Sequence, residues 1–144
     1  MRRRGELTPL RWSDEGVVLL DQRLLPREET WIDLKDPGEV ATAIRDMVVR
    51  GAPAIGISAA FGLVLGCRAA ESQSAESFDR AMEAHAETLL DARPTAVNLH
   101  HMVDRMQRVS AASETQSGLE LRDRLLAEAR TLSKKVYCSV IVST

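Results

Sequence analysis

Apolar residues recur at helical spacing over most of the chain after residue 36. The first such segment opens with Asp36-Pro37-Gly38-Glu39, in which Asp36 can cap a helix, Pro37 suits its first position and Glu39 completes a capping box. The positions that follow predict one buried face: Val40, Ala43, Ile44, Met47 and Val48. Gly51 is the expected stop, because glycine readily adopts the left-handed conformation that follows a helix C-terminus.

A second helix is predicted to begin at Pro53 and to run to about Ala70. The stretch from Gly51 to Cys67 carries no charge, and apart from one serine its residues are all small or apolar. It falls short of the ~20 residues that cross a bilayer. Its glycine and alanine content favours a core helix that packs closely on its neighbours over a membrane span.

Three further helices are predicted in the second half of the chain. One begins near Ser74 or Ser77, one follows Arg93-Pro94, and one follows Ser113. Methionines at this spacing are expected to fill gaps in the core, and His85 to be a core or boundary residue. The three apolar faces are, in chain order, Phe78, Ala81, Met82, His85 and Leu89; Leu99, Met102, Val103, Met106 and Val109; and Leu121, Leu125, Ala129 and Leu132.

The first third of the chain predicts strands. Leu10-Arg11-Trp12 and Val17-Val18-Leu19-Leu20 flank the polar turn Ser13-Asp14-Glu15-Gly16, and a third strand is expected near Trp31-Ile32-Asp33-Leu34. The predicted fold class is therefore α+β, a small N-terminal antiparallel β-sheet followed by a bundle of about five helices. The β-branched, uncharged segment from Val136 to Thr144 is expected to form a lone strand or an exposed sticky end.

Composition fits one compact domain with an ordinary surface. The chain has 144 residues, 44% of them hydrophobic and 28% charged, and a net charge of −2. This balance implies neither a nucleic-acid nor a membrane partner, and an aromatic content of 3% argues against a base-stacking platform. Cys67 and Cys138 fit no zinc spacing. Cys67 is expected to be a buried free thiol, a disulfide between the two is left open, and a reducing, cytoplasmic setting is the default.

The junction between the first two helices combines an arginine, a glycine and a helix N-terminus. The backbone N–H groups of Ala52, Ala54 and Ile55 are expected to point together, and the helix dipole adds positive potential there. Arg50 can add a fork of donors that matches phosphate, and Gly51 leaves room for the anion. The pattern predicts an anion site, of which phosphate is the favoured ligand. On spacing alone, a plain corner with a solvated arginine is the favoured alternative, because arginine is common at helix C-termini.

A second junction repeats this logic at Arg93-Pro94-Thr95-Ala96-Val97-Asn98-Leu99. Arg93 immediately precedes a helix start, so it too can reach an anion near an N-terminus. The alternative is an arginine that lies beside a cap. Asn98 can cap the helix or bridge to a neighbouring loop. His100 and His101 are adjacent, face different sides of a helix, and are expected to be surface or boundary residues.

The two junctions, together with Leu10-Arg11-Trp12 and Asp21-Gln22-Arg23-Leu24-Leu25-Pro26, resemble the methylthioribose-1-phosphate isomerase family of methionine salvage. The resemblance covers roughly residues 7 to 130. It implies an aldose–ketose isomerisation of 5-methylthioribose 1-phosphate to 5-methylthioribulose 1-phosphate in the cytoplasm, without a metal or redox cofactor. It also implies a homodimer, and it assigns substrate binding to Arg50, Gly51, Ala52 and Arg93. The same superfamily includes ribose-1,5-bisphosphate isomerases and the non-catalytic regulatory subunits of a translation-initiation exchange factor, and both remain alternatives.

The chain departs from this family pattern in its second half. The catalytic residues of the family are a cysteine in a Thr-His-Cys-Asn-like loop and a later aspartate, both in a Rossmann-like C-terminal domain, and neither motif occurs here. Cys138 lies between Tyr137 and Ser139 and is not assigned that role. The expectation is an N-terminal domain over residues 1–132, a divergent tail over 133–144, and no catalytic residue in this chain. A frameshift, a truncation and a genuine short protein remain alternatives for the tail. By itself the chain is expected to be inactive.

Overall fold

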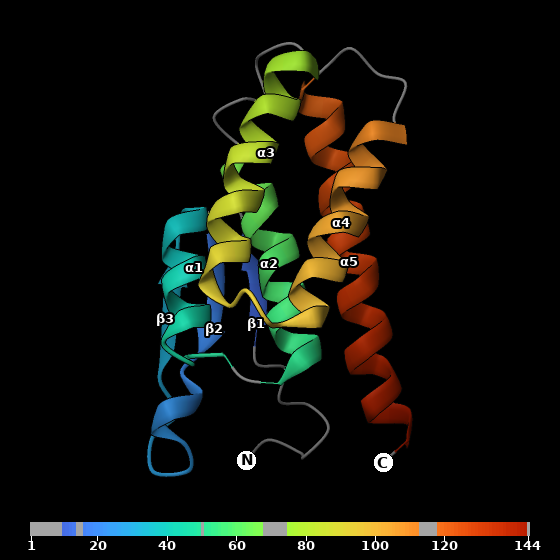
Figure 1. Ribbon diagram of the computed structural model, residues 1–144. Coiled ribbons are helices and arrows are strands. Elements are labelled where there is room, and N and C mark those ends of the chain that lie inside the picture. The colour runs from blue at the N-terminus through green and yellow to red at the C-terminus, as the bar shows by residue number, and fades with distance from the viewer. Residues whose placement is uncertain (1–9, 14–15, 50, 68–74, 113–117, 144) are drawn as a thin grey trace.

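The computed structural model describes residues 10–13, 16–49, 51–67, 75–112 and 118–143. Figure 1 shows a small sheet on the left beside α1, with α2 in the middle and α4 and α5 on the right. This arrangement confirms the predicted α+β class. The elements are, in chain order, β1 (Leu10–Ser13), β2 (Gly16–Leu20), the short 3-10 helix η2 (Gln22–Leu24), β3 (Trp31–Leu34), α1 (Pro37–Arg45), α2 (Ala52–Gly66), α3 (Ala75–Ala92), α4 (Val97–Ala112) and α5 (Gly118–Ser143).

The sheet is antiparallel in the order β1-β2-β3, as the strand pattern predicts. Because side chains alternate along a strand, Leu10 pairs with Leu19 and Val17 with Leu34 on one buried face. On that same face Trp12 stacks on Phe61 of α2, with ring centroids 5.5 Å apart. The sheet is thereby fastened to the central helix.

Helix α2 is the core of the molecule. Every residue from Ala54 to Cys67 is buried, and α2 contacts α1, α3, α4, α5 and the strands β1 and β2. A helix that is apolar on all sides is stable only where neighbours surround it, so the expectation of a closely packed core helix is confirmed. Its end is earlier than predicted, because the helix stops at Gly66 and Cys67 caps it. Among the described residues, no helix combines the length and apolar character needed to cross a bilayer.

Helix α1 begins as predicted and ends sooner. The Asp36 carboxylate accepts a 2.9 Å hydrogen bond from the Glu39 N–H, and Val40, Ala43 and Ile44 are buried. The helix ends at Arg45, so the prediction that Met47 continues the buried face and that Gly51 stops the helix is wrong.

The cause of this early end is a Schellman closure of α1. The Met47 N–H donates to the Ile44 carbonyl at 3.3 Å, and the Val48 N–H donates to the Ala43 carbonyl at 2.9 Å. Met47 takes the left-handed conformation, with φ of 65°, and is 43% exposed. The helix therefore ends without a glycine, and buried Val48 supplies the apolar contact that accompanies this motif.

The last three helices have the predicted buried faces. Half-buried positions on these faces are Ala81, His85, Met102 and Val109. The fully buried ones are Phe78, Met82 and Leu89 on α3; Leu99, Val103 and Met106 on α4; and Leu121, Leu125, Ala129 and Leu132 on α5.

The C-terminal segment differs from its predicted strand. Helix α5 continues without a break to Ser143. Extending an existing helix adds a hydrogen bond for each residue fixed, whereas a lone strand has no partner, so the helix overrides the β-branched composition.

Candidate functional site

The two predicted junctions meet in one pocket. Gly51 and Ile55 from the start of α2 line it together with Arg93, Ala96, Val97 and Asn98 from the α3–α4 connection and the start of α4. We call this the Gly51–Arg93 pocket, and its volume is about 290 Å³. That is the lower end of the range for ligand pockets and suits a phosphate with part of a sugar. Helices α2 and α4 both begin at the lower end of the molecule in Figure 1, which is where the pocket lies.

The wall formed by α2 is a helix N-terminus that no side chain of the described residues caps. Gly51 is the N-cap and makes no side-chain capping bond. The Ile55 N–H donates to the Gly51 carbonyl at 3.0 Å, so the prediction that this group is available to an anion is wrong. The reason is that Ile55 closes the first helical turn. The N–H groups of Ala52 and Ala54 have no hydrogen-bond partner among the described residues, and Pro53 carries none.

The backbone conformation at position 51 requires a glycine. Its φ is +92° with ψ of 131°, a region that a residue with a Cβ rarely adopts. Apart from its two chain neighbours, no described residue has an atom within 4 Å of a Cβ built at Gly51, so the position faces open space. The approach of a ligand's phosphate to Gly51 stays a prediction. Arg50, the preceding predicted residue, lies outside the described residues.

Arg93 supplies the positive charge that the structure describes in this pocket. It is half-buried, and it forms no ion pair with any other described residue. Its carbonyl accepts a 3.0 Å hydrogen bond from the Ala96 N–H, which closes a turn just before α4. A guanidinium in this place can hold two oxygens of a phosphate at once.

Close packing of α2 on α4 brings the two walls together. A Cβ at Gly56 would lie only 3.2 Å from the Asn98 carbonyl oxygen, so the absence of a side chain there allows the two helices to approach. Sequence reasoning named Asn98 as a cap or bridge and Ile55 only for its backbone N–H group, and it assigned no role to Ala96 and Val97. Apolar residues carry no chemical signal of their own, so only their position beside a predicted helix start could have pointed to them.

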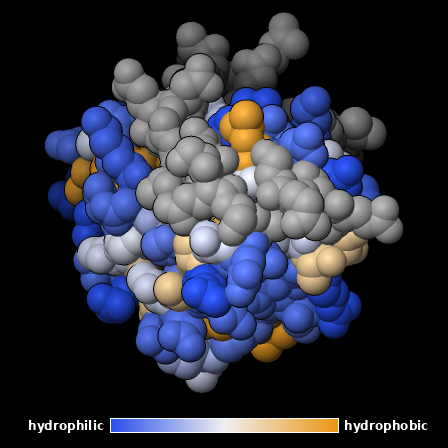
Figure 2. Space-filling model, turned by 90° about the horizontal axis from the view of Figure 1, so that it is seen from above, coloured by the Kyte–Doolittle hydropathy of each residue, from blue (hydrophilic) through white to orange (hydrophobic). Residues whose placement is uncertain are grey.

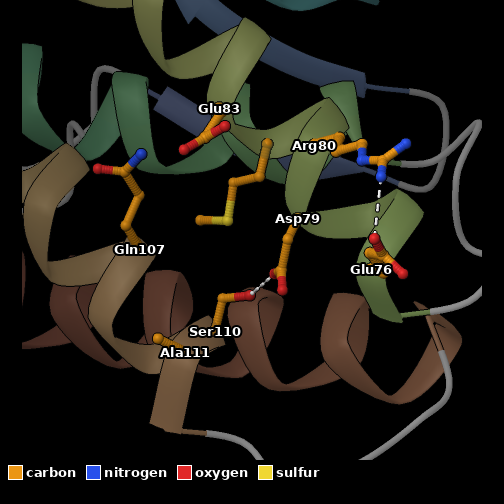
Figure 3. Close-up of a pocket in the computed structure, with 8 residues that line it drawn as sticks. Glu76, Asp79, Arg80, Glu83, Gln107, Ser110 and Ala111 are labelled. Carbon is orange, nitrogen blue, oxygen red and sulfur yellow. Dashed lines mark hydrogen bonds and ion pairs between the residues drawn. The ribbon is translucent and has the colours of Figure 1, made fainter.

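A second pocket of about 290 Å³ lies between α3 and α4 and has the opposite electrostatic character (Figure 3). Glu76, Asp79 and Glu83 line it, and its arginine, Arg80, pairs with Glu76 at 2.9 Å. The Ser110 hydroxyl donates to the Asp79 carboxylate at 2.9 Å and joins the two helices (Figure 3). This lining repels an anion, so the Gly51–Arg93 pocket is the better candidate site for phosphate.

Cys67 is unsuited to nucleophilic chemistry. Burial, and to a smaller extent the charge of Asp79, raises the pKa of its thiol to about 12. The thiol is therefore protonated at neutral pH, and only the thiolate is a good nucleophile. This agrees with the prediction of a buried free thiol. The side chain of Cys138 lies outside the described part of the structure.

The surface at the opposite end of the molecule is mostly hydrophilic. Figure 2 looks onto the end where α3 begins and α4 ends, and blue predominates among its described residues, with only isolated orange patches. Within the described ranges, no group of three or more His, Cys, Asp or Glu side chains could hold a metal ion.

The sequence is similar to one protein family and to named members of it. The model of the initiation factor 2 subunit family matches residues 48–140, a stretch that contains both walls of the pocket. A methylthioribose-1-phosphate isomerase of Pseudomonas aeruginosa is 50% identical over 115 residues, which are 77% of this chain and 32% of that relative. An isomerase of the same name from Geobacter sulfurreducens is 44% identical over 120 residues, 83% of this chain and 35% of the relative.

Two solved structures share the fold. The delta subunit of translation initiation factor eIF-2B from A. fulgidus superposes with a TM-score of 0.82 at 32% identity, over 90% of this chain and 37% of that one. The 5-methylthioribose 1-phosphate isomerase from Pyrococcus horikoshii OT3 gives 0.81 at 31% identity, over 92% and 40%. The chain thus spans about a third of the length of the curated relatives it matches.

Proposed function

The chain belongs to the initiation factor 2 subunit family, and we propose that it supplies the phosphate-binding loops of a methylthioribose-1-phosphate isomerase. The substrate would be 5-methylthioribose 1-phosphate, and the reaction its isomerisation to the corresponding ketose phosphate. Arg50, Gly51, Ala52 and Arg93 would bind it. The observation that carries the proposal is that Gly51 and Arg93, far apart in the sequence, line one pocket.

The role of these residues is to anchor and orient the phosphate. An anion at the start of α2 would receive hydrogen bonds from the Ala52 and Ala54 N–H groups, which have no partner among the described residues, and favourable potential from the helix dipole. Arg93 would approach the same anion from the α4 side of the pocket. Fixing one end of the sugar in this way supplies proximity and orientation, whereas proton transfer needs groups that these loops do not contain.

We expect the 144-residue chain to bind without turning substrate over. Neither the Thr-His-Cys-Asn-like loop nor the later aspartate that the resemblance assigns to catalysis occurs in its sequence. A homodimer and a cytoplasmic location remain predictions from the resemblance, and sedimentation of the purified chain tests the first of them.

A non-catalytic assembly module is the second candidate function. The similarity to the delta subunit, with a TM-score of 0.82, favours it as far as the fold is concerned. The isomerase reading draws its support from the 50% identity to the Pseudomonas aeruginosa protein and from an arginine that lines the pocket without an ion-pair partner among the described residues.

Calorimetric titration of 5-methylthioribose 1-phosphate into the purified chain separates the two functions. Arg93→Ala is expected to weaken binding at least about tenfold, because a hydrogen bond to a charged group contributes about 1.5–3 kcal/mol. Arg108→Ala is the matched control, since Arg108 is a 79% exposed arginine of α4 that pairs with Asp104. Ribose 1,5-bisphosphate is titrated in parallel to rank the two substrates. Equal or unmeasurable binding in all three proteins would favour the assembly module.

A further inference from the structure

The ring of His100 reaches back from α4 to the connection that carries Arg93. Its Nε2 atom lies 2.8 Å from the carbonyl oxygen of Pro94. Because a carbonyl oxygen can only accept, the Nε2–H group donates. Pro94 directly follows Arg93, so this bond is made one peptide away from the arginine of the pocket.

The same connection is held at a second point. The Ala96 N–H donates to the Arg93 carbonyl at 3.0 Å, and the His100 N–H donates to the Ala96 carbonyl at 3.2 Å. The Arg93 carbonyl thus has its partner in Ala96, the residue before α4, and the Pro94 carbonyl has its partner in the first turn of α4. Proline also fixes its own φ near −65°, which removes one rotation from the turn. The backbone after Arg93 is therefore held at both carbonyls, one by the residue that precedes α4 and the other by His100 of α4.

The hydrogen bond from His100 contributes more to the orientation of the Pro94 carbonyl than to the stability of the fold. His100 and Pro94 are both exposed, so water can replace either partner and the net contribution to folding is small. What water cannot replace is the direction that the bond imposes. A carbonyl held toward α4 fixes the peptide plane between Pro94 and Thr95, and with it the path along which the chain leaves Arg93.

The neighbouring histidine provides an internal comparison. His101 lines a different pocket, of about 500 Å³, between α4 and α5, together with Met102, Arg105 and Leu132. It is also exposed, and it makes no hydrogen bond to the connection among the described residues. Two adjacent histidines on one helix therefore differ in whether they touch the Arg93 connection.

We propose that His100 is a positioning residue for the phosphate site, which acts by holding the Pro94 carbonyl so that Arg93 enters the Gly51–Arg93 pocket in a fixed direction. This inference rests on the proposed function, because it assumes that Arg93 binds phosphate. It assigns a role to a residue that sequence reasoning treated as a surface or boundary histidine.

Three variants of the 144-residue chain test the proposal. His100→Leu removes the donor at similar size, His100→Gln keeps an N–H donor at similar reach, and His101→Leu is the matched control. Binding of 5-methylthioribose 1-phosphate is measured by calorimetry, and the backbone motion of Thr95 and Ala96 by ¹⁵N relaxation. We expect His100→Leu to weaken binding about threefold to tenfold, the size of one ordinary hydrogen bond. His100→Gln and His101→Leu should stay within about twofold of the wild type.

Retained thermal stability in His100→Leu, together with recovery in His100→Gln, would distinguish positioning from a merely structural role. Wild-type affinity in His100→Leu, or equal losses in the Leu and Gln variants, would overturn the inference and leave the proposed function intact. The wild-type chain could bind no sugar phosphate while Thr95 becomes more mobile only in His100→Leu. The proposed function would then be wrong, but His100 would still be shown to restrain the backbone of the connection. If the chain binds no sugar phosphate and the mobility of Thr95 does not change, both the proposed function and the positioning role of His100 are wrong.

Discussion

Gly51 and Arg93 line the same pocket although α2 and α3 separate them in the sequence. Gly51 precedes α2 with φ of +92°, and Arg93 precedes the turn into α4. One residue contributes a backbone conformation and the other a charge. Because these contributions differ in kind, they can be removed separately.

Replacing Gly51 by alanine should damage the pocket through the backbone alone. An L-residue at this φ costs about 1–3 kcal/mol of strain, so we expect Gly51→Ala to lose about that much in its free energy of unfolding, measured with urea. Binding of inorganic phosphate should weaken as well, because relief of the strain reorients the first N–H groups of α2. A variant as stable as the wild type would show that the position does not need glycine.

Replacing Met47 by glycine should stabilise the protein. Met47 holds the left-handed conformation at the end of α1, with φ of 65°, at a cost of about 1–2 kcal/mol for a residue with a Cβ. Since its side chain is 43% exposed, little buried area is lost on its removal. We expect Met47→Gly to raise the urea midpoint, and Met47→Ala, which keeps the Cβ, to leave it unchanged or lower it. A fall in the glycine variant would contradict the Schellman assignment.

Replacing Gly66 by alanine should destabilise the junction of α2, α3 and α1. The new Cβ would collide with the ring of His85 and would lie 2.6 Å from Cγ of Pro37. Overpacking of this kind costs about 1–3 kcal/mol, partly offset by the better helix propensity of alanine. The double variant Gly66→Ala/His85→Ala removes one of the two collisions. We expect a measurable coupling energy between the two sites, and strict additivity would show that they do not touch.

Acid should weaken the connection between β2 and β3. The Asp21 carboxylate accepts hydrogen bonds from Nε and Nη2 of Arg23, at 3.0 and 2.8 Å, and from the Arg23 backbone N–H at 3.0 Å. The side-chain hydrogen bond from Arg23 lowers the pKa of Asp21 against the opposing effect of burial, with further help from the backbone bond and the Arg23 charge. A lowered folded-state pKa stabilises the fold above the ordinary carboxyl pKa, and this contribution is lost as the pH falls through the folded value.

The unfolding free energy of the wild type should therefore decline below about pH 4. Asp21→Asn should show a shallower decline over the same range, because it has no carboxylate to titrate, together with lower stability at neutral pH. Parallel pH profiles for the two proteins would rule Asp21 out as the source of the acid sensitivity.

Local backbone chemistry is what the sequence alone determined about this protein. The Asp36 cap, the start of α2 beside Gly51 and the buried faces of α3, α4 and α5 each depend on residues within one or two turns, so composition and spacing were sufficient to predict them. The arginine and glycine of the candidate site were predicted for the same reason, since a helix start is a local feature.

Only the tertiary structure decided how these local features are arranged relative to one another in space. The meeting of the two connections depends on α2 and α4 packing closely where Gly56 faces the Asn98 carbonyl, and the apolar wall of Ile55, Ala96 and Val97 follows from that packing. The early end of α1 and the bond from His100 to Pro94 also escaped prediction. In each case several arrangements of similar free energy are possible for the local segment. The difference between them depends on contacts with residues that are distant in the sequence, or on small differences between alternative hydrogen-bond partners, so local sequence patterns do not predict it.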